Sequence, residues 1–127
     1  MMISLWKDKN TGEWITDDGQ IFDIDDYILI DIFDFCGCGH TKSAVEHIIG
    51  ALKLIKEKDE INKNTKFEDW YEEWAEKVSN FFNHDRGAQT IMWYCFDRAG
   101  LTDHGGSVPG WLTEKGYDLI DLYEKVT

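Results

Sequence analysis

The chain of 127 residues has a single proline, no linker rich in glycine or serine, and no long hydrophobic run. Without a composition change that marks a boundary, we expect one domain over residues 1–127. No run of about 18 apolar residues occurs, and the opening MMISLWKDKN lacks the apolar centre of a signal peptide. We therefore expect a cytoplasmic protein with no membrane partner.

Basic residues are scarce: 13 Lys and Arg stand against 25 Asp and Glu, which gives a net charge of −12 at pH 7. Such a chain repels phosphate backbones, so direct nucleic-acid binding is disfavoured. A protein with a basic surface is a better partner, including one that normally holds DNA or RNA. The alternative is that the acidity only keeps the protein soluble.

Cysteine is also rare, and an odd number of three does not indicate a disulfide framework. Two of the three lie in the segment DFCGCGH, at Cys36 and Cys38, shortly before His40. With His104 from a second glycine-rich segment, Cys36, Cys38 and His40 are candidate ligands of a zinc ion. The one-residue spacing departs from the usual Cys-x2-Cys arrangement of zinc sites.

Two other interpretations of DFCGCGH stay open. The sulfurs precede a predicted helix, whose dipole favours the thiolate, so this segment could hold a reactive thiol. Alternatively, Gly37 and Gly39 form a tight turn, and the small cysteine side chains pack beneath it.

Aromatic residues are abundant, with six Trp, five Tyr and seven Phe, and they supply a substantial core. Short β-prone segments on both sides of residues 7–12 predict an N-terminal β-hairpin. Residues 101–112 are compatible with a second short hairpin. Residues 24–35 fit either a strand or a helix capped by Asp23 or Asp25, and the acids at their start favour the helix.

The remaining segments predict four more helices. Capping-box spacing places two starts at Ser43 and Thr65. A third helix covers 85–99 and ends at Gly100, and Thr113 caps the last helix. The predicted fold class is mainly α (α+β), a compact helical domain with a small N-terminal hairpin. We expect its core to contain Trp70, Trp74, Phe81, Ile91, Phe96, Ile48 and Leu52.

The helix over residues 67–82 carries a dense row of acids on its outer face. Together with acids near the N-terminus, this row is a candidate surface for a basic partner, imitating a nucleic-acid backbone. An ordinary solvated helix face is the alternative. The candidate partner-binding residues are Glu68, Asp69, Glu72, Glu73, Glu76, Asp23, Asp25 and Asp26.

No catalytic motif accompanies these features. The pairs Asp103–His104 and His84–Asp85 join an acid to a histidine, but neither comes with a serine or cysteine nucleophile. The spacing of an EF-hand and the frame of a phosphate-binding loop are both absent. We therefore expect no enzymatic activity and identify no catalytic residue.

The C-terminal segment GLTDHGGSVPGWLTEKGYDLIDLYEKV resembles the wing and final helix of winged-helix regulators, in which LTxKG often precedes the closing helix. This resemblance implies a hairpin followed by a helix. Such regulators carry basic residues on the wing, whereas this segment has Asp103 and His104 there. DNA reading by this element is therefore not expected.

Together, DFCGCG and GLTDHGGSVPGWLTEKG resemble a group of small proteins encoded by phages and prophages of Gram-positive bacteria. The resemblance implies a phage context and draws attention to Cys36, Cys38, His104 and Trp111. Our hypothesis is an acidic accessory protein, acting in the host cytosol, that binds and inhibits a host-defence or nucleic-acid-handling factor. The alternatives are a zinc-stabilised winged-helix-like regulatory module and a small thiol-dependent enzyme or ligand-binding protein.

Overall fold

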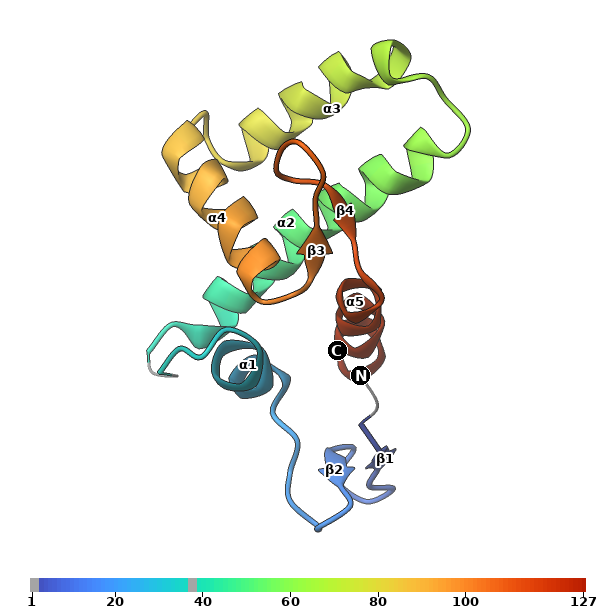
Figure 1. Cartoon of the computed structure of the whole chain (residues 1–127). Helices are drawn as coiled ribbons and strands as arrows, with labels where there is room; N and C mark the ends of the chain where they lie inside the picture. The colour runs from blue at the N-terminus through green and yellow to red at the C-terminus, as the bar shows by residue number, and fades with distance from the viewer. Residues whose placement is uncertain (1–2, 37–38) are drawn as a thin grey trace.

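The computed structural model describes residues 3–36 and 39–127, which are mainly α-helical with two small antiparallel hairpins (Figure 1). This architecture confirms the predicted fold class. The elements, in chain order, are β1 (Leu5–Lys7), β2 (Trp14–Thr16), α1 (Ile24–Asp26), the π-helical segment η1 (Tyr27–Ile32), α2 (Thr41–Asn62), α3 (Phe67–Phe81), α4 (Arg86–Arg98), β3 (Thr102–Asp103), β4 (Trp111–Leu112) and α5 (Glu114–Val126).

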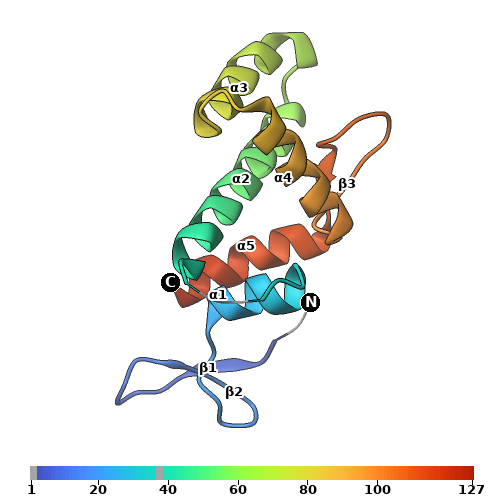
Figure 2. The same cartoon turned by 90° about the vertical axis from the view of Figure 1, so that its left-hand side faces the viewer.

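Helix α2 is the centre of the fold, because α1, η1, α3, α4, α5 and β4 all contact it. Its 22 residues span about 33 Å. Val45, Leu52 and Ile55 recur at helical spacing and are completely buried. In Figures 1 and 2, α1 lies near the N-terminal end of α2, whereas α3 folds back along its C-terminal half. The two ends of α2 therefore carry different neighbours.

Buried side chains from all the helices form a single hydrophobic cluster. Among the residues predicted for the core, Phe96 and Leu52 are fully buried and Phe81 is half-buried against the cluster. The others that are buried as predicted are Trp70, Trp74 and Ile48.

The core prediction is wrong at Ile91, whose side chain is 67% exposed. Helix α4 turns Trp93 and Phe96 inward instead, and these are 3% and 0% exposed. Apolar residues lie on more than one side of α4, so periodicity alone does not identify the buried stripe. Burying the large indole of Trp93 removes more apolar area from water than burying Ile91 would.

Residues 24–32 are helical rather than extended, whereas residues 33–35 follow the end of η1 and are neither helix nor strand. The Asp23 carboxylate caps this segment by accepting hydrogen bonds from the backbone N–H groups of Asp25 at 2.9 Å and Asp26 at 3.3 Å. The helix then widens, and the Phe33 N–H donates to the Ile28 carbonyl at 3.2 Å. Asp23, one of the two predicted caps, therefore begins the helix, and the preference for a helix is confirmed as far as Ile32.

Two predicted helix starts are wrong in detail. Helix α2 begins at Thr41, ahead of Ser43, and α3 begins at Phe67 with Lys66 rather than Thr65 at the capping position. Neither start has a side-chain cap. These helices are held by the burial of their apolar faces, so the capping-box spacing carries no information about where they begin.

Three other boundaries follow the sequence closely. The Asp85 carboxylate caps α4 by accepting from the Ala88 N–H at 3.0 Å. The Thr113 hydroxyl caps α5 by accepting from the Gly116 N–H at 3.2 Å. Gly100 ends α4 with a φ of +76°, a backbone conformation that glycine adopts without strain.

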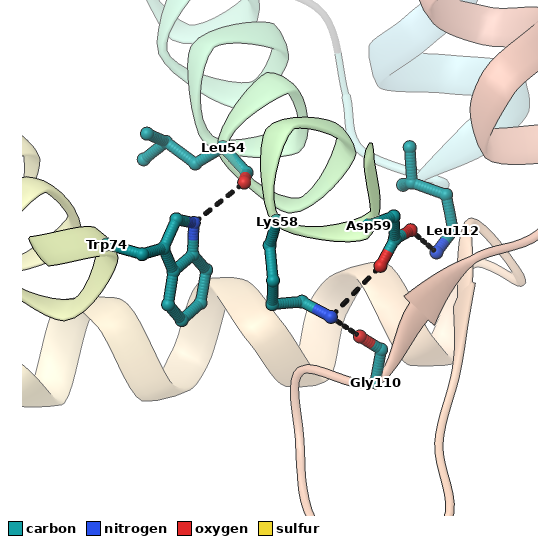
Figure 3. Close-up of polar contacts among 6 residues, drawn as sticks. All are labelled: Leu54, Lys58, Asp59, Trp74, Gly110 and Leu112. Atoms are coloured by element: carbon teal, nitrogen blue, oxygen red, sulfur yellow. Dashed lines mark hydrogen bonds and ion pairs between the residues drawn. The ribbon is translucent and has the colours of Figure 1, made fainter. Parts of the chain in front are cut away.

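The hairpin formed by β3 and β4 is tied to α2 by a pair of polar side chains (Figure 3). Asp59 accepts hydrogen bonds from the Leu112 N–H at 2.8 Å and from the Lys58 ammonium at 3.0 Å. Lys58 also donates to the carbonyl oxygen of Gly110. The side chains of Lys58 and Asp59 are only 14% and 11% exposed, so these bonds form in a region of restricted water access.

The N-terminal hairpin lies away from α3 in both views of the chain (Figures 1 and 2). Strands β1 and β2 pair Leu5 with Thr16 and Lys7 with Trp14, as expected for the predicted hairpin. The Lys125 ammonium, from α5, lies 5.2 Å from the centre of the Trp14 ring. None of the described helices combines the length and the apolar character needed to cross a bilayer.

Candidate functional site

The segment DFCGCGH connects η1 to α2. Cys36 is exposed, and His40 is exposed immediately before the first residue of α2. Cys38 lies outside the described residues. Gly39 has a φ of +67°, so the chain does turn sharply into α2 at a glycine. The bend expected at Gly39 is therefore present, Gly37 lies outside the described residues, and the role of the two thiols is still a prediction.

His104, the fourth predicted zinc ligand, lies beside two carboxylates, those of Asp97 and Asp103. Its Nδ1 is 2.9 Å from an oxygen of Asp97, and its backbone N–H donates to Asp103 at 2.8 Å. Potential ligand atoms of these three residues lie within 4.8 Å of one another, the single such group in the part of the chain that the structure describes. The group contains neither Cys36 nor His40, so the proposed zinc ligands are not brought together among the described residues.

Helix α3 places its acids as the sequence predicts. All five carboxylates lie on the exposed face, opposite the buried side chains of Trp70, Trp74 and Val78. None of the five forms an ion pair with another described residue; the nearby Lys77 pairs with Glu57 of α2 at 2.6 Å instead. We call these five residues, Glu68, Asp69, Glu72, Glu73 and Glu76, the acidic face.

The N-terminal acids do not extend this acidic face. Asp23 is committed to capping α1, and Asp25 is half-buried beside it. They lie near the N-terminal end of α2, whereas the acidic face lies along its C-terminal half (Figure 2). The sequence places both clusters correctly on exposed helical segments, but the tertiary structure separates them by much of the length of α2.

We expect Asp25→Asn to raise the free energy of unfolding at neutral pH. Burial, and then the neighbouring Asp23 carboxylate, raise the pKa of Asp25 above its ordinary value. The native state therefore holds this proton more tightly than the unfolded chain does, and stability from Asp25 falls as pH rises through its pKa. In urea unfolding between about pH 4 and pH 7, the free energy of unfolding of the variant should exceed that of wild type by an amount that grows with pH.

The matched control is Asp26→Asn, which removes the same charge from the exposed neighbour. We expect this change to alter the free energy of unfolding by less than about 0.5 kcal/mol. An advantage of Asp25→Asn that shrank as the pH rose would contradict the prediction.

A cleft that sequence reasoning missed lies between α3, α4 and the loop from β3 to β4. Its volume is about 610 Å³, and aromatic rings from α3, α4 and β4 line it. Two of its tryptophans, Trp70 and Trp93, have buried indole N–H groups without a hydrogen-bond partner in the described chain. The available signal was the high tryptophan content together with the Gly105–Gly106 pair, but only the fold brings these segments together.

Comparison of the chain with protein-family models, with curated proteins and with solved structures finds no match.

Proposed function

We propose that this protein is a phage-encoded accessory protein that binds a basic protein surface through the acidic face of α3. Its partner would be a host or phage protein, such as a host-defence or nucleic-acid-handling factor that it inhibits in the host cytosol. The observation that carries this proposal is the acidic face itself, with five exposed carboxylates, none of them within ion-pair distance of a described cation, although Glu73 lies near enough to help raise the pKa of Lys77.

The arrangement of α3 supports this use. Neighbouring carboxylates on one helix face repel one another, so a basic partner would relieve repulsion that the isolated protein bears. Phe67 and Tyr71 flank the acids at 56% and 43% exposure, with ring centres 4.7 Å apart. Exposed aromatics beside charges are typical of binding surfaces, where rings supply affinity and charges supply orientation and association rate.

Affinity capture from host lysate tests the proposal with a triple variant, Glu72→Gln, Glu73→Gln and Glu76→Gln. The matched control removes three acids elsewhere, with Glu13→Gln, Asp17→Asn and Asp121→Asn, all at exposed positions. Both variants change the net charge equally. We expect wild type and control to retain the same partner, and the α3 variant to retain about tenfold less of it.

The salt dependence gives a second, independent readout. Raising the salt from about 50 to 200 mM should release the partner from wild type, because exposed charge pairs are screened over this range. Equal losses in both variants would attribute binding to net charge alone and reject a specific role for the acidic face. Capture that is indifferent to salt, or no partner at all, would reject the electrostatic proposal.

A further inference from the structure

The cleft between α3, α4 and the β3–β4 loop has strongly aromatic walls. In Figures 1 and 2, this loop lies next to α4. The volume of about 610 Å³ falls within the range of small-molecule sites in proteins. Six aromatic side chains line it: Phe67, Trp70, Tyr71 and Trp74 from α3, Trp93 from α4 and Trp111 from β4.

Two tryptophans that line the cleft have indole N–H groups that are buried and have no hydrogen-bond partner in the described chain. The Nε1 atoms of Trp70 and Trp93 are buried and have no hydrogen-bond acceptor in the described chain, and the two residues are only 7% and 3% exposed. Trp74, in the same wall, donates its N–H to the Leu54 carbonyl at 2.8 Å. Leaving a buried donor unpaired costs about 1–3 kcal/mol, so the empty cleft carries two such penalties.

The charge of the cleft is opposite to that of the protein. Among the described residues, the charged ones that line it are Lys58 and Arg86, although the chain has a net charge of −12. The Lys58 ammonium is already bonded to Asp59 and Gly110. The Arg86 guanidinium forms no ion pair with any described residue, so it is available to an anion.

Two glycines of the β3–β4 loop form part of one wall of the cleft. Gly105 and Gly106 line it from the β3–β4 loop, and no heavy atom lies within 4 Å of the position where a Cβ would stand on either. The walls from α3 and α4 are fixed by the core instead. Because the two indole N–H groups are themselves buried, a ligand that pairs with them requires local movement of the cleft wall, and we place this movement at the two glycines.

We propose that this cleft binds a small planar organic anion. The ring system of the ligand stacks against the aromatic walls, and its anionic group pairs with Arg86. Acceptor atoms of the ligand accept hydrogen bonds from the indole N–H groups of Trp70 and Trp93. A nucleoside monophosphate and an aromatic carboxylate both have this chemistry. None of the five residues of the acidic face lines the cleft, although Phe67 and Tyr71 border both surfaces.

Nuclear magnetic resonance of the 15N-labelled protein tests this inference through its tryptophan indole signals. The probes are adenosine monophosphate and indole-3-acetate, each paired with a ligand of the same ring and no negative charge, adenosine and tryptamine. We expect at least one anion to move the indole N–H signals of Trp70 and Trp93 downfield as they gain acceptors. The Trp74 signal should move least, because its hydrogen bond to Leu54 already exists.

Variants at two exposed arginines of α4 separate the site from general charge effects. Arg86→Gln should lower the affinity for the anion that binds by about tenfold, since it removes the charge that pairs with the ligand. Arg98→Gln makes the same change at the other end of α4, outside the cleft, and should leave the affinity unchanged. Both side chains are exposed, so neither substitution should prevent folding.

The possible results distinguish a nucleotide from an aromatic carboxylate as the ligand, and both from the absence of a binding site. Binding of only the nucleotide or only the carboxylate supports the site and identifies its ligand class. Indole signals of Trp70 and Trp93 that stay in place up to about 10 mM of both anions would overturn the proposal, because their N–H groups would then be satisfied by neighbouring rings. Equal affinity for the uncharged or cationic partner ligands, or equal losses in Arg86→Gln and Arg98→Gln, would also overturn it.

Discussion

Replacement of Asp59 by alanine should lower the free energy of unfolding by about 3 kcal/mol. The carboxylate accepts hydrogen bonds from the Leu112 N–H and from Lys58, and both bonds are shielded from water (Figure 3). Alanine would leave the buried Leu112 N–H unpaired and would strand most of the Lys58 charge in a poorly hydrated position. Removal of one partner from such a pair is costly because the other remains. Urea denaturation of the variant measures the loss.

Two controls separate the shielded pair from ordinary surface charge. Glu57→Ala breaks the Lys77–Glu57 ion pair, whose side chains are 56% and 40% exposed, and should cost less than about 1 kcal/mol. Lys58→Met should cost less than Asp59→Ala, since Asp59 keeps its bond from the Leu112 N–H. A loss from Asp59→Ala no greater than that from Glu57→Ala would show that Asp59 does not anchor the β3–β4 hairpin.

Replacement of Gly116 by alanine should also destabilise the protein, by about 2 kcal/mol, although alanine favours helices. A Cβ at this position would stand 2.3 Å from the carbonyl oxygen of Leu101. Helix propensity alone predicts a gain of about 1 kcal/mol. Overpacking against backbone costs about 1–3 kcal/mol or more, and the first turn of α5 cannot move without disturbing the buried Leu119 and Ile120. Thermal or urea unfolding shows directly whether Gly116→Ala lowers or raises the free energy of unfolding.

Gly105→Ala is the control for the second prediction. It introduces the same methyl group into the loop of the hairpin, where no heavy atom lies within 4 Å of the added Cβ. We expect its free energy of unfolding to stay within about 0.5 kcal/mol of wild type. A Gly116→Ala variant that is more stable than wild type would mean that helix propensity outweighs the contact with Leu101.

The motif LTEKG has a structural explanation in this chain. Leu112 is buried and donates its N–H to Asp59, while Thr113 caps α5. The Lys115 ammonium donates to the Ala99 carbonyl at 2.7 Å. Gly116 permits the approach of Leu101. The motif therefore joins the end of α4, the hairpin and α5, and its residue pattern can be understood without DNA binding.

The two proposed functions depend on different residues of α3, apart from Phe67 and Tyr71, which border both surfaces. The acidic face is continuous in the sequence, so its residues could be identified from helical spacing alone. The cleft could not, because its walls come from α3, α4 and β4. Its two unpaired indole N–H groups are a property of packing, and a sequence pattern contains no information about which tryptophan finds an acceptor.

The sequence by itself determined the features that are built from hydrogen bonds within a few residues. These include the Asp23, Asp85 and Thr113 caps, the end of α4 at Gly100 and the N-terminal hairpin. Each depends on a side chain or backbone preference that acts on its immediate neighbours.

Only the tertiary structure decided which faces are buried and which distant residues meet. It turned Trp93 rather than Ile91 inward, grouped His104 with Asp97, separated the N-terminal acids from the acidic face and closed the cleft. The physical reason is that these outcomes depend on the total area buried between elements far apart in the chain. The bond from Leu112 to Asp59, which spans 53 positions, is one contact that no local pattern specifies.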